Sequence, residues 1–176
     1  MKYDKKKKAK WLSIDFICVL ILIALDQFTK SLAIGKLKGQ DAFPLIENIF
    51  ELDYVENRGA AFGLYQDRKI LLLIIGTVFM IAVIMVLVRI PLEKKYMIYH
   101  FTVASILAGG FGNMLDRIIK GYVVDFFSFV LIHFPVFNVA DIYITLSCIG
   151  LLALHLFVYS EDDLLFLIPK KKMSEQ

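Results

Sequence analysis

The sequence predicts an all-α integral membrane protein, a four-transmembrane-helix bundle with a small extracytoplasmic β-containing loop. Of the 176 residues, 59% are hydrophobic and the mean hydropathy is +0.68, a value that soluble domains of this length rarely reach. The apolar residues also fall in long blocks, and four of these blocks reach the roughly 20 residues needed to cross the hydrocarbon core of a bilayer. A chain of this size supplies one compact bundle, so we expect residues 1–176 to form a single membrane domain.

The first predicted span covers about residues 11–34 and follows a basic tail at residues 1–10. A basic start followed by an apolar segment also resembles a cleavable secretory signal peptide. The run is long enough to span, however, and Asp26 and Lys30 lie where the apolar core of a signal peptide would continue. We therefore favour an uncleaved first span.

The segment between the first two spans contains a predicted strand. Residues 49–55 alternate apolar and acidic side chains, which is typical of a strand with two different faces. Residues 57–63 follow and are rich in glycine and alanine, which indicates backbone packed closely against a neighbour. We expect a strand-containing loop on the membrane surface.

Three further spans are predicted at about residues 70–88, 96–115 and 139–159, with a second tail at residues 160–176. Four spans place both termini on one side of the membrane. The two tails and the short turn at residues 89–95 are rich in Lys and Arg, so the positive-inside rule places them in the cytoplasm. The costly polar groups near the outer ends of the spans and in the loops beside them, such as Asp26, Asn113 and Asp141, then converge at the outer membrane surface.

Asp26, Lys30 and Asp116 are interpreted as structural polar residues. Asp26 and Lys30 are four residues apart on a helix, so their charges can neutralise each other on one face. Asp116 has Arg117 beside it and Asn113 one helical turn earlier, so it too is expected to be ionised and paired.

Asp125 and Asp141 have no cation close to them in the sequence. Asp125 lies among valines and phenylalanines, and desolvation without a partner charge raises the pKa of a carboxyl group. The alternative is an ordinary loop aspartate that faces water. For Asp141 the alternative is helix capping, with Asn138 as the N-cap, and this role is compatible with a chemical one.

Two such carboxylates at one membrane face suggest a pair that shares one proton and activates a water molecule, as in aspartic peptidases. The D-T-G signature of the soluble enzymes is absent. The scattered histidines and two isolated cysteines give no metal-ligand spacing, so we expect neither a metal nor a cofactor. No G-x-S-x-G motif supports serine catalysis, and the basic tails are topological signals and not a nucleic-acid site.

Five short motifs follow one another along the predicted frame: Asp26-Gln27-x-x-Lys30, Asn57-x-Gly59-Ala60-Ala61-Phe62, Gly112-Asn113-x-x-Asp116-Arg117, Val124-Asp125-Phe126 and Phe137-Asn138-x-Ala140-Asp141. Their residues and their order closely resemble the bacterial lipoprotein signal peptidases, also called signal peptidase II, an aspartic peptidase family. The likeness extends over nearly the whole chain, from Leu12 to about Tyr159.

The resemblance implies an intramembrane aspartic endopeptidase that removes signal peptides from prolipoproteins. The cut would fall just before a lipobox cysteine that already carries a diacylglyceryl group. The resemblance makes Asp125 and Asp141 the catalytic dyad and gives a supporting or substrate-binding role to Asn57, Gly59, Asn113, Arg117, Asn138 and Ala140. It further implies a monomer without a cofactor in the bacterial cytoplasmic membrane, with the active site at the outer face and with prolipoproteins and membrane lipid as partners.

Two other functions use the same aspartates. A proton-coupled carrier or channel normally needs polar groups through the depth of the membrane, whereas the second predicted span contains no charged side chain. A non-catalytic scaffold held by ion pairs would not need two carboxylates without nearby cations. Both are less consistent with the sequence than the peptidase.

Overall fold

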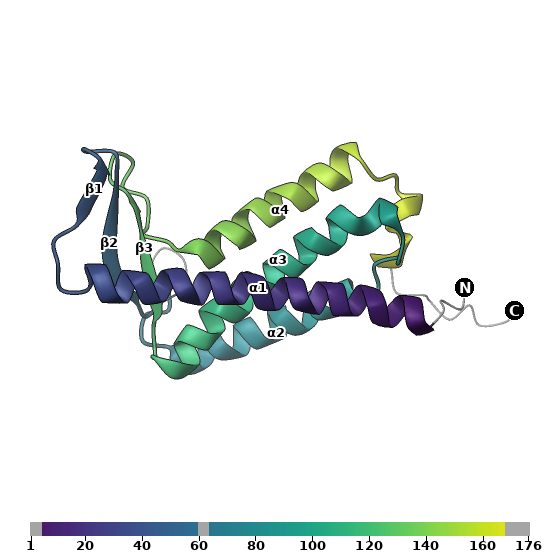
Figure 1. The fold of residues 1–176 in the computed structure, drawn as a ribbon, viewed down its shortest axis with the longest axis horizontal. Coiled ribbons are helices and arrows are strands. Elements are labelled where there is room, and N and C mark those ends of the chain that lie inside the picture. The colour runs from purple at the N-terminus through teal and green to yellow at the C-terminus, as the bar shows by residue number, and fades with distance from the viewer. Residues whose placement is uncertain (1–4, 60–63, 168–176) are drawn as a thin grey trace, which may run out of the picture.

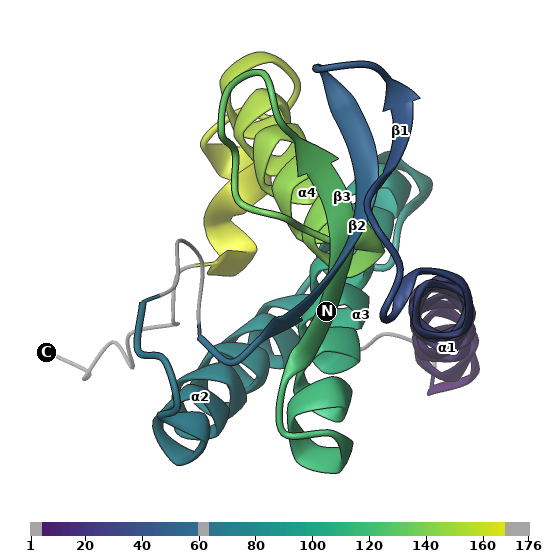
Figure 2. The same ribbon diagram turned by 90° about the vertical axis from the view of Figure 1, so that its left-hand side faces the viewer.

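The computed structural model describes residues 5–59 and 64–167, so the predicted close packing at residues 60–63 lies outside the described part. Four long helices make up most of the fold: α1 (Lys5–Leu37), α2 (Lys69–Leu87), α3 (Met97–Ile119) and α4 (Val139–Phe157). They run side by side, with α3 between the other three (Figures 1 and 2). Helix α1 begins inside the predicted basic tail and continues past residue 34.

Within the described residues, three helices are long and apolar enough to cross a membrane: α1, α2 and α4. The predicted span at residues 96–115 is helical as part of α3, but α3 is not one of these three. Its sequence carries His100, Asn113, Asp116 and Arg117, which lower its hydropathy. Much of α3 is buried against its neighbours, whereas α1, α2 and α4 expose many large apolar side chains. Small residues allow this central position because they let neighbouring helices approach closely.

A small antiparallel sheet of three strands stands at one end of the helices, in the order β1 (Phe43–Ile46), β2 (Phe50–Asn57) and β3 (Val123–Phe129). The predicted strand at residues 49–55 is therefore confirmed as β2. For the segment that forms strand β3, the sequence pattern predicts only a connection between two spans. Figure 2 shows the sheet crossing the ends of the helices, and Figure 1 shows it at the far end from η3 (Asp162–Leu167).

Two buried clusters hold this arrangement. The larger lies among α1–α4 and includes Val19, Met80 and Val103. The smaller packs Ala33 of α1 against Val124 and Phe126 of β3 and so ties the sheet to the bundle. At the opposite end, a short helix η2 (Lys94–Tyr96) precedes α3, and η3 packs its Phe166 ring edge-on against Tyr96.

Candidate active site

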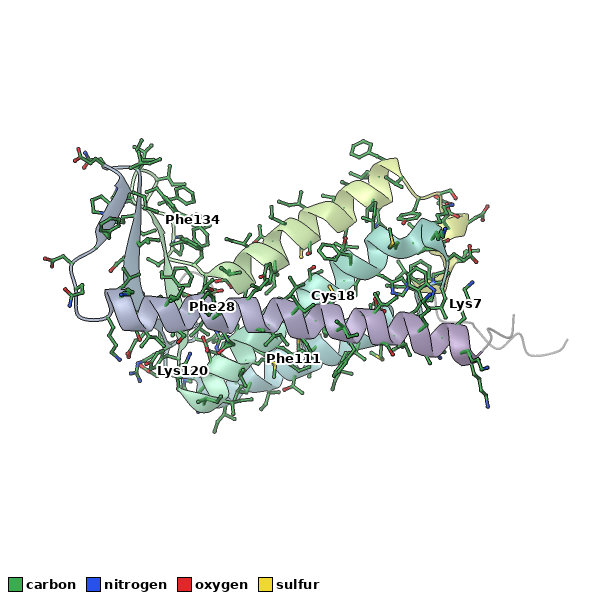
Figure 3. All side chains as sticks on the ribbon, viewed as in Figure 1. Lys7, Cys18, Phe28, Phe111, Lys120 and Phe134 are labelled. Carbon is green, nitrogen blue, oxygen red and sulfur yellow. The ribbon has the colours of Figure 1, made fainter. Side chains whose placement is uncertain are left out.

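The polar residues predicted to converge lie at the end of the bundle that carries the sheet. Asn57 comes from the end of β2, Asp125 from β3, Asn113 from the last turns of α3, and Asp141 from the first turn of α4. Lys120, which follows α3, and Phe134, beside the sheet, mark this end in Figure 3. Four segments that are distant in the sequence therefore deliver their side chains to one place.

Asp125 is buried, with 2% of its surface exposed, so it is not a loop aspartate that faces water. Strand β3 holds it between β2 on one side and the residues before α4 on the other, where Phe127 bridges Phe137. Its two carboxylate oxygens accept hydrogen bonds from Asn57 Nδ2 at 2.9 Å and Asn138 Nδ2 at 2.5 Å. Burial, followed by the negative charge of Asp141, raises the pKa of Asp125 to about 7.

Asp141 is part of a capping box at the start of α4. The Asn138 side chain accepts from the Asp141 backbone N–H at 3.1 Å, and Asp141 Oδ2 accepts from the Asn138 backbone N–H at 3.2 Å. The predicted capping role is thus confirmed. The other oxygen, Oδ1, accepts from Asn113 Nδ2 at 2.8 Å. Capping therefore fixes the carboxylate without using all of its acceptor capacity.

An amide network joins the two carboxylates. The Asn138 side chain is fully buried and its Nδ2 donates to Asp125 and also to Asn113 Oδ1 at 3.2 Å. Asn113 in turn donates to Asp141. Each carboxylate consequently has its position fixed by side chains from a different element, which is the preorganisation that acid–base chemistry requires.

The predicted pairing of Asp26 with Lys30 is confirmed at 2.9 Å, with both side chains fully buried. The predicted partner of Asp116 was wrong. Asp116 pairs with Lys30 at 3.2 Å and with Lys120 at 2.7 Å, and not with Arg117. Consecutive residues of a helix point about 100° apart, so Arg117 faces another direction.

Arg117 instead holds backbone carbonyls beside the site. Its Nη2 donates to Gly59 O at 2.8 Å and its Nη1 to Asn113 O at 3.4 Å. Gly59 also donates its N–H to Asn57 Oδ1 at 2.9 Å, which orients the Asn57 amide toward Asp125. Ala140 takes part through its backbone alone, since its N–H donates to Asp26 Oδ1 at 3.1 Å.

A cavity of about 830 Å³ opens beside the two aspartates. Its polar side includes Asn57, Asn113, Arg117, Asp125 and Asp141, and its apolar walls include Phe129, Ile132, Phe134, Ile142 and Leu146. A cavity with one polar side and apolar walls can hold a peptide bond next to long hydrocarbon chains.

Four polar lining residues were not predicted from the sequence. Thr145 lies one turn after Asp141 on α4, so helical spacing could have placed it on the same face. No comparable sequence signal points to Glu56, Arg58 or Gln66. Within residues 5–59 and 64–167, no group of three or more Asp, Glu, His or Cys side chains is arranged to hold a metal ion.

Comparison with known proteins shows the family to which the chain is similar. A family model described as signal peptidase (SPase) II matches residues 18–158. The lipoprotein signal peptidase of Brevibacillus brevis is 41% identical over 143 residues, which are 81% of this chain and 94% of that relative. The lipoprotein signal peptidase of Caldanaerobacter subterraneus subsp. tengcongensis is 42% identical over 142 residues, 80% of this chain and 94% of the relative.

The fold is also similar to a solved bacterial membrane enzyme, determined by the in meso method at 1.9 Å resolution. The two share a TM-score of 0.68 and 26% sequence identity, over 84% of this chain and 95% of the other.

Proposed function

Because the chain belongs to the signal peptidase II family of bacterial membrane hydrolases, whose members cleave lipoprotein signal peptides, we propose that it cuts diacylglyceryl-modified prolipoproteins just before the lipobox cysteine. Asp125 and Asp141 form the catalytic dyad in this proposal. The observation that carries it is their arrangement on one cavity, where each carboxylate is oriented by an asparagine.

The chemistry follows from two carboxyl groups that share one proton near neutral pH. The ionised member takes a proton from a water molecule as the water oxygen attacks the scissile carbonyl carbon, and the protonated member donates to the carbonyl oxygen. When the resulting diol collapses, the C–N bond breaks and the leaving amine takes up a proton from the dyad. The raised pKa of Asp125 supports this division, because one carboxyl group must remain neutral close to pH 7.

The walls of the cavity suit a lipid-anchored substrate. Ile142 and Leu146 follow Asp141 along α4, and Phe134 lies in the segment before this helix. Acyl chains can lie along these side chains while the peptide bond reaches the aspartates.

We propose that α3 crosses the membrane together with the other three helices, with both termini in the cytoplasm, the sheet at the outer face, and a monomer as the active unit.

A proton carrier is less well supported. Among the described residues, the cluster at the sheet end is accompanied by one more buried pair, Asp15 with His100 at 2.9 Å, toward the other end of the bundle. The two sites are separated by about 16 Å along α1, at 1.5 Å per residue from Asp15 to Asp26. The intervening described side chains of α1 are apolar apart from Cys18, so they supply no chain of proton acceptors.

The experiment that tests the function incubates the purified protein with a lipobox precursor, with and without the diacylglyceryl group, and maps the products by mass. We expect one cut immediately before the cysteine in the lipidated precursor and much slower cleavage of the unlipidated one. Equal cleavage of both precursors, or a cut elsewhere, would contradict the proposed substrate. Asp53→Asn serves as the control variant, because Asp53 lies on β2 outside the cavity lining.

A further inference from the structure

Lys30 makes three polar contacts from a fully buried position on α1. Its Nζ lies 2.9 Å from Asp26 Oδ2 and 3.2 Å from Asp116 Oδ2, and it donates to Asn113 Oδ1 at 2.8 Å. A lysine ammonium group has three N–H bonds, so the three contacts use its whole donor capacity. None of the residues that line the cavity comes from α1, so Lys30 lies behind the site and does not line it.

Each of the three contacts continues to one of the two predicted catalytic aspartates. Asp26 Oδ1 accepts from the backbone N–H of Ala140, the residue immediately before Asp141, at 3.1 Å. Asp116 Oδ2 accepts from the backbone N–H of Val124, the residue immediately before Asp125, at 3.2 Å.

The third contact reaches a dyad side chain directly. Asn113 Oδ1 accepts from Lys30 and from Asn138 Nδ2, so its own Nδ2 must face the opposite way, toward Asp141 Oδ1 at 2.8 Å. Lys30, together with the Asn138 amide, therefore determines which end of the Asn113 amide meets Asp141.

We propose that Lys30 is a positioning residue for the dyad: it clasps Asp26, Asp116 and Asn113 together and so sets the separation and orientation of Asp125 and Asp141. This inference rests on the proposed function, since it concerns the residues that the function uses. It reassigns Lys30 from a residue that only stabilises the bundle to one that determines the catalytic geometry.

A purely structural polar pair between the same helices would not need these connections. Asp15 of α1 and His100 of α3 are such a pair, buried and 2.9 Å apart, and their described contacts do not lead to Asp125 or Asp141. The chain therefore contains its own matched control: two buried pairs join α1 to α3, and one of them is connected to the dyad.

The test compares two double variants, each of which removes one of the two buried pairs. Lys30→Met/Asp26→Asn removes the clasp while keeping an acceptor for the Ala140 N–H, and Asp15→Asn/His100→Phe removes the control pair while keeping a ring against Trp11. If the first variant does not fold, Lys30→Met/Asp116→Asn provides the same test, with an acceptor kept for Val124. All measurements are made on the folded fraction of the full chain.

Two readouts separate positioning from stability. Without the clasp, hydrogen–deuterium exchange at the Val124 and Ala140 amides should accelerate at least about tenfold, because their acceptors are no longer held together. On the lipidated precursor, kcat should fall at least about tenfold with KM within about threefold, as expected for lost transition-state geometry. The control variant should lower the melting temperature and leave both readouts unchanged.

The proposal is overturned if either readout of the clasp variant matches the wild type. It is also overturned if the control variant changes kcat and amide exchange to the same extent, because Lys30 would then act only by holding α1 in place. If the wild-type protein cleaves no precursor, the proposed function is wrong, while the exchange measurement still decides whether Lys30 holds the two segments.

Discussion

Replacing Asp125 with Asn should change how the stability of the folded protein depends on pH. Burial and the Asp141 charge raise the pKa of Asp125 from 3.8 to about 7. Between these two values the folded state keeps a proton that the unfolded state has lost, so the free energy of unfolding of the wild type falls as pH rises through this window. Above about pH 7 both states are ionised and the contribution becomes constant.

The size of the effect follows from the same two values. Integrated from about pH 5 to about pH 8, the wild type should lose about 2.5 kcal/mol of stability through Asp125, an order-of-magnitude figure. The Asn variant lacks this loss. It has a separate cost, because the carboxamide has one acceptor oxygen for the two donors Asn57 and Asn138, but that cost of about 1–3 kcal/mol is the same at every pH.

The assay is reversible unfolding by SDS titration in mixed micelles, for the wild type and Asp125→Asn at about pH 5 and about pH 8. The stability of the variant relative to the wild type should improve by about 2.5 kcal/mol at the higher pH. Asp53→Asn, a substitution on β2, is the control and should track the wild type at both values. A stability difference between Asp125→Asn and the wild type that does not change with pH would refute the reasoning.

Two further substitutions test the geometry around the dyad. A Cβ added at Gly112 would meet the Asp26 carboxylate, whose Cγ would lie 3.1 Å away. Gly112→Ala should therefore destabilise the folded protein by about 1–3 kcal/mol and lower its activity. In Gly150→Ala the new Cβ would meet only Thr102 Cγ2, at 3.7 Å, so this variant should be close to the wild type in melting and cleavage assays. Asn138→Ala removes the α4 cap at a cost of about 1 kcal/mol. Asn138→Ser should recover part of that stability but not the activity, since serine is too short to donate to Asp125; recovery of both would show that the cap alone matters.

The features predicted correctly from the sequence are those that depend on near neighbours. The Asp26–Lys30 pair and the Asn138–Asp141 capping box are separated by four and three residues, so helical periodicity alone reveals them. The alternation at residues 49–55 likewise predicts β2 from local pattern. Convergence of Asn113, Asp125 and Asp141 at one end followed from counting spans and applying the positive-inside rule. The buried Asp15–His100 pair, which lies toward the other end, was not part of that expectation.

The features that were missed depend on tertiary neighbours. Lys30 and Asp116 are brought together by the packing of α1 on α3, and nothing in the sequence around either residue indicates the other. Strand β3 exists because Val123–Phe129 pairs with β2 across the end of the bundle. In the sequence Arg117 is the cation nearest to Asp116, and only the fold shows that Lys30 and Lys120 are its partners.

The central claim is that Asp125 and Asp141 act together as the dyad. The most direct measurement is the kcat of folded Asp125→Asn and of folded Asp141→Asn on the lipidated precursor, compared with the wild type and Asp53→Asn. We expect both dyad variants to lose processing almost completely while they still insert and fold, and the Asp53 variant to keep it. Substantial processing by either dyad variant would contradict the assignment.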